Sequence, residues 1–128
     1  MTIKRLPDSE FEIMDIIWDN PSPITTLQIM DKLGFGRQIK MQTLLTMLVR
    51  LIEKGFLTSE RVGRERNYSP VVSKRDYMTI ETESFMSRHY ISSIGSLMQT
   101  FYSGRELSQN ELTELQAWLA ERGKGESE

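Results

Sequence analysis

Several hydrogen-bonding side chains stand close together in the middle of this 128-residue chain, at spacings typical of one helix face. Gln42 can form two hydrogen bonds with adenine, and Thr43 and Thr46 each offer a hydroxyl group and a methyl group that fits thymine. Lys40 precedes them and can pair with a phosphate. This combination predicts contacts with the base edges and phosphates of double-stranded DNA.

Positive charge is concentrated around these residues. The whole chain has a formal net charge of −2, but residues 36–66 carry seven Lys or Arg and three Glu, a local net charge of +4. A basic segment of this kind is typical of a localised phosphate-binding face. Arg50 could equally pair with a carboxylate or with the end of its own helix. The residues expected at DNA are Arg37, Lys40, Gln42, Thr43, Thr46, Arg50 and Arg64.

Helical periodicity and capping residues predict the elements that position these side chains. Apolar residues at intervals of three and four predict helices over residues 9–18, 26–33, 41–54, 74–102 and 109–122, with residues 123–128 frayed. In a capping box, Ser or Thr caps a helix and an acid or amide three residues later bonds back to it. The boxes are Ser9 with Glu12, Thr25 with Gln28, Ser73 with Asp76, and Ser108 with Glu111.

A hairpin is expected directly after the third helix. Alternating residues predict strands over 57–62 and 66–72, joined by Gly63, Arg64 and Glu65, with further arginines at 61 and 66 near the tip. A short helix, a turn over Gly34–Gly36 and a longer helix form a helix-turn-helix, and the hairpin is its wing. The expected fold is mainly α with a small β-hairpin. A winged helix-turn-helix DNA-binding domain spans 1–72, and a helical dimerisation domain spans 73–128.

The helix expected over residues 74–102 carries a broad apolar stripe. The winged part has its own core, so the helix over 109–122 alone remains in the chain to cover the stripe. A second copy is therefore expected to cover it, giving a homodimer that suits a palindromic operator. An internal helical cluster without a partner is the alternative. The expected interface residues are Met86, Tyr90, Ile94, Leu97, Phe101, Leu112, Leu115 and Leu119.

The composition argues against most enzyme classes. The chain has no cysteine and one histidine, His89, and it shows no phosphate-binding loop and no metal-spaced cluster. We therefore expect no catalysis, no metal and no cofactor. No apolar run approaches the roughly 20 residues that span a bilayer, and no apolar signal core opens the sequence. A cytoplasmic location is expected.

Two other functions remain open at this point. The first is a winged helix that binds protein instead of DNA, which the acidic total charge permits. The second is a DNA-binding repressor controlled by a small molecule. Its pocket would lie among aromatic residues of the helical half, namely Tyr77, Phe85, Tyr90 and Trp118.

The sequence resembles the penicillinase-repressor family of winged-helix repressors of β-lactam resistance. The resemblance covers nearly the whole chain. It is carried by Trp18-Asp19 after the first helix and by Tyr68-Ser69-Pro70 in the wing. It is most specific in helix three, from Gln42 to Gly55, and in the segment from Leu97 to Leu115.

The resemblance implies a dimeric repressor of β-lactamase or related resistance genes that binds a palindromic operator. It also implies inactivation without a small ligand, in which a membrane-bound sensor metalloprotease leads to cleavage in the dimerisation helix. The corresponding bond here joins Thr100 and Phe101, and Thr100 stands where the best-studied members have Asn. The copper-responsive branch of the family holds Cu(I) with a cysteine-rich tail, which this chain lacks.

Overall fold

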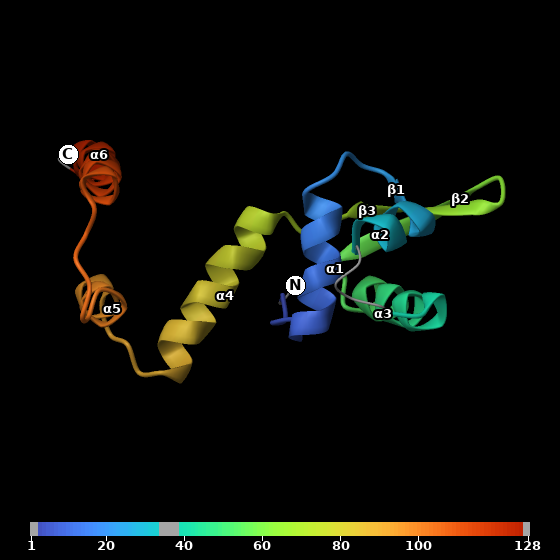
Figure 1. Ribbon diagram of the computed structural model, residues 1–128, viewed down its shortest axis with the longest axis horizontal. Coiled ribbons are helices and arrows are strands. Elements are labelled where there is room, and N and C mark those ends of the chain that lie inside the picture. The colour runs from blue at the N-terminus through green and yellow to red at the C-terminus, as the bar shows by residue number, and fades with distance from the viewer. Residues whose placement is uncertain (1–2, 34–38, 127–128) are drawn as a thin grey trace. The chain divides into compact units, whose positions relative to one another are not determined.

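The computed structural model describes residues 3–33 and 39–126, and the chain divides into two compact units, Met1–Phe85 and Met86–Glu128. Figure 1 shows the order of the elements along the chain. The boundary lies later in the sequence than the division at residues 72 and 73 that we expected. The turn predicted over residues 34–36 lies outside the described residues.

Three helices form most of the first unit. They are α1 (Asp8–Trp18), α2 (Thr26–Leu33) and α3 (Met41–Glu53), and each begins and ends within one residue of its predicted bounds. Their apolar faces meet in one core, where Ile13, Ile29 and Leu48 are at most 1% exposed. Burial of such side chains is the main force that holds these short helices together. The predicted mainly α fold class is confirmed.

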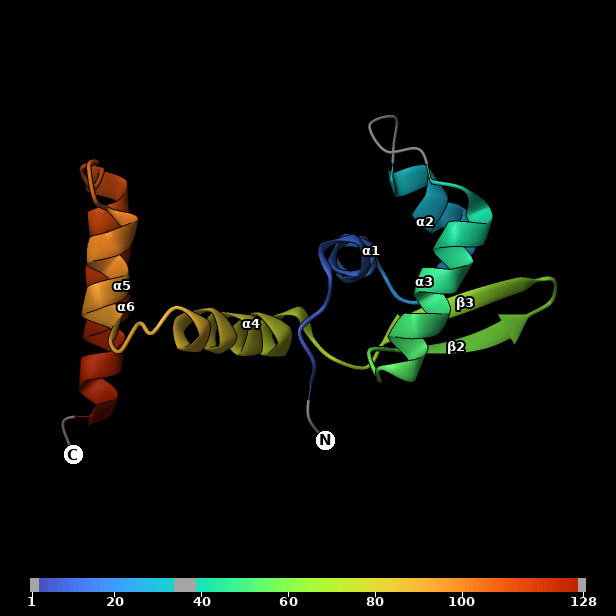
Figure 2. The same cartoon turned by 90° about the horizontal axis from the view of Figure 1, so that it is seen from below.

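A small antiparallel sheet completes this unit, in the strand order β1-β3-β2. The predicted hairpin is formed by β2 (Leu57–Val62) and β3 (Glu65–Pro70), and Gly63 at its turn has a φ of 64°. That left-handed conformation favours glycine. The hairpin extends beyond the helices as a wing (Figure 2). Strand β1 (Ile24–Thr25) pairs with β3 and was not predicted, because two residues are too few to show an alternating pattern.

Two of the four predicted capping boxes are confirmed in full, and a third shows its cap bond alone. Thr25 and Gln28 bond reciprocally, as do Ser108 and Glu111, and Ser73 Oγ accepts a hydrogen bond from the amide of Asp76. The box at Ser9 is wrong. Helix α1 begins at Asp8 after Pro7, whose carbonyl accepts from Phe11, so Ser9 lies inside the helix. A proline at this point removes the donor that would have no partner anyway.

A buried ion pair joins the start of α1 to the end of α3. Lys54 Nζ donates to Glu10 Oε1 over 2.5 Å. The Glu10 side chain is 4% exposed and that of Lys54 is 27% exposed. A carboxylate buried to this degree needs a partner, since its transfer out of water is costly.

The first part of α4 (Lys74–Arg88) belongs to the first unit because Tyr77 is anchored in the core. Its hydroxyl accepts from the Leu6 amide over 2.8 Å and donates to Glu81 Oε2 over 2.7 Å. Burial raises the pKa of Tyr77 to about 12, so the hydroxyl stays protonated at neutral pH. The ring packs against the rings of Phe11, Trp18 and Phe56. Tyr77 thus fixes the beginning of α4 to the winged part.

The single long helix expected over residues 74–102 is wrong. Helix α4 ends at Arg88, and α5 (Ile94–Phe101) begins after Ser93, whose Oγ accepts from the Ser96 amide. Tyr90 has a φ of 58°, which a helix cannot continue through. The consecutive serines 92 and 93 favour a cap over a helix interior because their hydroxyls compete for backbone groups.

The last helix is longer than predicted. Helix α6 (Gln109–Glu126) begins at the expected residue but continues beyond Arg122, where we expected the chain to fray. Each residue added to an existing helix gains one backbone hydrogen bond, which offsets the weak helix propensity of Gly123.

Candidate nucleic-acid interface

The two faces of α3 differ sharply. Leu44, Leu48 and Leu51 are fully buried on the core side. Gln42 and Thr43 are exposed on the other side, as are Thr46 and Arg50. The core therefore holds the helix rigidly while its hydrogen-bonding face is open to solvent. This is the arrangement that a helix needs to enter the major groove of DNA.

Two details define this polar face further. The Thr46 hydroxyl donates to the Gln42 carbonyl over 3.0 Å, so its oxygen remains able to accept while the side chain is held in place. Lys40 is exposed directly before the first turn of α3, in an extended conformation. The predicted phosphate ligand Arg37 lies outside the described residues.

The wing stands beside α3, with a groove of about 580 Å³ between them. Its walls include Ser59, Arg64 and Arg66 from the wing. The facing wall comes from α2 and α3, and it includes Leu27, Leu45 and Val49, which are 62%, 37% and 52% exposed. From their helical spacing we expected Leu27 and Leu45 to face the core, whereas both are exposed. The sequence did not single out Ser59 or Val49. A helical period alone does not separate a residue at the edge of the core from one inside it.

The predicted interface residues all lie in the second unit, but not on one stripe. The break after Arg88 separates Met86 and Tyr90 from the residues of α5, so one continuous stripe does not form. Exposed apolar side chains are nevertheless frequent here. Tyr90, Ile94, Phe101 and Leu119 are 94%, 65%, 60% and 53% exposed, and Met86, Leu97, Leu112 and Leu115 are half-buried.

The bond between Thr100 and Phe101 lies at the end of α5, next to a network that joins α5 to α6. Glu111 Oε2 accepts from the Tyr102 hydroxyl over 2.7 Å and pairs with Arg105 over 3.0 Å. The Arg105 guanidinium also lies 4.8 Å from the centres of the Phe101 and Tyr102 rings. The bond therefore lies at the last residue of α5, beside side-chain contacts that join the end of α5 to α6.

We expect Glu111 to titrate far below an ordinary glutamate. The Tyr102 hydroxyl, with help from Ser108, lowers its pKa from 4.5 to about 2. Because the folded pKa is depressed, the contribution of Glu111 to stability is fully present above pH 4.5 and is lost as the pH falls toward 2. Carboxyl carbon NMR of Glu111 should show the low midpoint, and Tyr102→Phe should raise it. A midpoint that Tyr102→Phe leaves unchanged would contradict this role of the tyrosine.

Other kinds of site have little support in the described residues. They hold no group of three or more His, Cys, Asp or Glu that could bind a metal, and none of their helices is long and apolar enough to cross a membrane. His89 is exposed. Of the aromatic residues considered for a small-molecule pocket, Tyr77 is buried in the core, whereas Phe85, Tyr90 and Trp118 are exposed.

Comparison with known proteins identifies the family. The family model described as Penicillinase repressor matches residues 6–121. The chain belongs to this family. The penicillinase repressor of Bacillus licheniformis is 34% identical over 119 residues, which cover 93% of this chain and 92% of that protein. The methicillin resistance regulatory protein MecI of Staphylococcus aureus (strain N315) is 25% identical over 111 residues, covering 87% and 89%.

Solved structures of this family agree with the winged-helix fold. The DNA-binding domain of the repressor BlaI matches with a TM-score of 0.53 and 36% identity, covering 59% of this chain and 92% of that one. Bacillus licheniformis BlaI, solved as a monomeric form in complex with the blaP half-operator, matches with a TM-score of 0.50 and the same identity and coverage. This member of the penicillinase repressor family is thus a DNA-binding transcriptional repressor.

Proposed function

We propose that this repressor binds, as a homodimer, the palindromic operator of a β-lactamase gene or a related resistance gene. The observation that carries the proposal is α3, whose leucines are fully buried on one face while Gln42, Thr43 and Thr46 are exposed on the other. The similarity to BlaI in complex with a half-operator supports the same use of the fold here. The protein acts as a regulator rather than an enzyme, at operator DNA in the cytoplasm.

Each predicted residue has a distinct part in this proposal. Gln42 and Thr43 read base edges in the major groove, with Thr46 one turn further along α3. Lys40 and Arg50 contact phosphates, as does Arg37 outside the described residues. Arg64, exposed at the wing turn, enters the minor groove, where a guanidinium is favoured.

In this proposal the second unit forms the dimer interface and contains the bond whose cleavage inactivates the repressor. Exposed apolar side chains such as Ile94 and Phe101 support burial against a second copy. Cleavage between Thr100 and Phe101, following the action of a membrane sensor metalloprotease, would remove part of that interface. When one winged domain of a dimer binds its half-site, the second domain is held at a high effective concentration near the other half-site, which raises the affinity. Separated winged domains lose this gain in affinity.

We expect Gln42→Ala to weaken operator binding by about 10- to 100-fold, because a bidentate contact to adenine contributes roughly 1–3 kcal/mol. The loss should be confined to operators that keep one particular A·T pair. Fluorescence anisotropy on the operator and on single-pair variants measures it. Gln116→Ala, which changes an exposed glutamine of α6, is the matched control. If Gln42→Ala weakened binding to the operator and to every single-pair variant by the same factor, Gln42 would not recognise a base.

The proposed function is tested by titrating the full chain against a palindromic duplex from its own promoter region and against a scrambled duplex, at low and at high salt. We expect tight binding to the palindrome that falls steeply as salt rises, since bound phosphates release counterions. Equal and weak binding to both duplexes would contradict operator recognition and would favour a protein-binding winged helix.

A further inference from the structure

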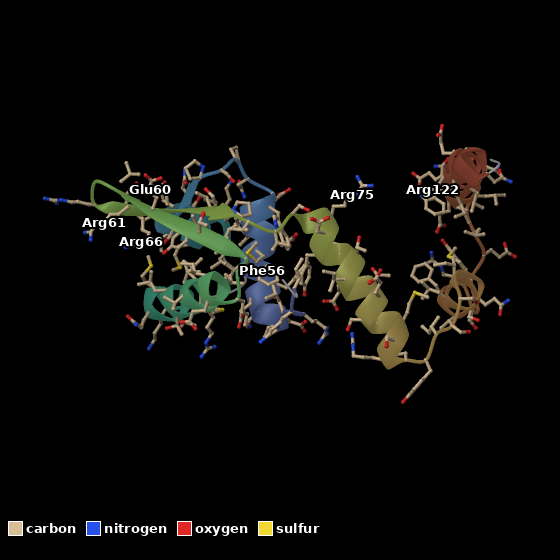
Figure 3. All side chains as sticks on the ribbon, turned by 180° about the vertical axis from the view of Figure 1, so that it is seen from behind. Phe56, Glu60, Arg61, Arg66, Arg75 and Arg122 are labelled. Atoms are coloured by element: carbon tan, nitrogen blue, oxygen red, sulfur yellow. The ribbon has the colours of Figure 1, made fainter. Side chains whose placement is uncertain are left out.

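Two arginines oppose each other across the wing. Arg61 of β2 and Arg66 of β3 are direct partners in the antiparallel register. Directly opposite residues lie on the same face of a hairpin with their side chains close together, and like charges in this position are destabilising. Figure 3 shows both side chains on the side of the hairpin that faces α3, with Glu60 on the other side. The wing thus keeps an unfavourable pair on its inner face.

The structure holds these guanidinium groups in place without neutralising them. Arg66 Nη1 donates to Ser59 Oγ over 3.0 Å, and Arg61 Nε makes a longer contact of 3.4 Å with the Gly63 carbonyl. Within residues 3–33 and 39–126, neither arginine forms an ion pair with a carboxylate. Ser59 lies two residues before Arg61 in β2, so it shares the same face. Most of the donors of both groups remain open.

The surface next to this pair fits a sugar-phosphate backbone. Ser59 and Arg66 line the groove of about 580 Å³ opposite Leu45 and Val49 of α3, and Glu65 is the acidic residue on its wall within the described part of the chain. Deoxyribose rings have apolar surfaces that can pack against such aliphatic side chains. A guanidinium group presents donors in a fork that matches phosphate oxygens.

We propose that Arg61 and Arg66 together clamp one phosphate of the operator, and that Ser59 is the residue that positions Arg66 for it. This inference rests on the proposed function. The phosphate supplies the negative charge that relieves the repulsion between the two guanidinium groups. The wing therefore contributes a defined phosphate site in addition to Arg64 at its tip.

The proposed clamp predicts two effects of losing either arginine, weaker operator binding and a more stable free protein, which a merely structural residue would not combine. Arg66→Gln or Arg61→Gln should weaken binding of the full chain to the operator by about tenfold or more and should lower the salt slope by about 1. The same variants should raise the melting temperature of the free protein at low salt by about 2 °C, because a like-charge pair is removed. Arg75→Gln on α4, away from the wing in Figure 3, is the matched control for lost charge and should do neither.

Ser59 is tested by a double-mutant cycle. Ser59→Ala should weaken operator binding several-fold while leaving the salt slope unchanged, because no charge is lost. It should have no further effect in the Arg66→Gln protein, and Ser59→Thr should restore binding. Additive losses from Ser59→Ala and Arg66→Gln would overturn the positioning role.

The binding experiments distinguish a failure of the arginine clamp from a failure of the proposed operator recognition. If the unaltered protein does not select its operator, the proposed function fails and the clamp fails with it. If the protein binds selectively but both arginine variants match Arg75→Gln in affinity and salt slope, the clamp is overturned while operator recognition stands.

Discussion

Replacing Ile94 with aspartate should convert the dimer to monomers at micromolar concentration and weaken binding to the palindromic operator by about 10²- to 10⁴-fold. Ile94 is the first residue of α5 and is 65% exposed in the single chain. In the proposed dimer it is covered by the second copy, so the variant would bury a charge that has no partner. The winged part is a separate unit, and its contacts with one half-site should survive.

Sedimentation velocity measures the association state, and anisotropy on full and half operators measures binding. Val71→Asp is the matched control, because Val71 is 57% exposed and belongs to the first unit. Affinity of the Ile94 variant for a half-site duplex should equal that of the unaltered chain. A variant that remained dimeric at micromolar concentration would remove Ile94 from the interface.

The second large effect concerns stability. Lys54→Met should lower the free energy of unfolding of the first unit by about 3 kcal/mol, because it leaves the Glu10 carboxylate buried without its partner. The side chain of Glu10 is 4% exposed, so water cannot replace the lost ammonium group without rearrangement. The loss of unfolding free energy therefore comes mainly from the buried, unpaired carboxylate of Glu10 and less from the lost attraction between Lys54 and Glu10.

Denaturation of the first unit can be followed selectively in a Trp118→Phe background, where Trp18 is the remaining tryptophan of the chain. Lys74→Met is the control, since it breaks the Lys74–Asp15 pair, whose side chains are 52% and 48% exposed. That change should cost much less than Lys54→Met, because exposed ion pairs contribute little to stability. The double variant Glu10→Gln with Lys54→Met should recover most of the loss. Equal losses from the two lysine variants would contradict a special role for the buried pair.

The sequence predicted best those elements whose local signals and core contacts agree. Helix α3 begins at Met41 as expected, since its leucines repeat at helical spacing. The break near Tyr90 was missed for the opposite reason. The apolar residues on both sides of it continue one helical period, and the competing signals are a serine cap and one left-handed residue. Strand β1 depends on pairing with Tyr68 and Asn67, which no local pattern contains.

For the candidate site, the exposed polar residues of α3 could be found from the sequence because they lie opposite its apolar face. The partnership of Arg61 with Arg66 could not. It depends on the strand register, and a shift of one residue would place the two side chains on different faces. The groove beside α3 likewise depends on how the wing packs and not on any segment alone.

The anchoring of Tyr77 determines how short an autonomous fragment of this protein can be. A fragment that ended at residue 72 would lose the hydroxyl that bonds to the Leu6 amide and the ring that covers Phe11, Trp18 and Phe56. A fragment that ends at Phe85 keeps Tyr77 together with Glu81 and its pair with Arg5. Recombinant half-repressors for structural work should therefore extend through the first turns of α4. Truncation before them would yield a domain with an uncovered aromatic patch and a tendency to aggregate.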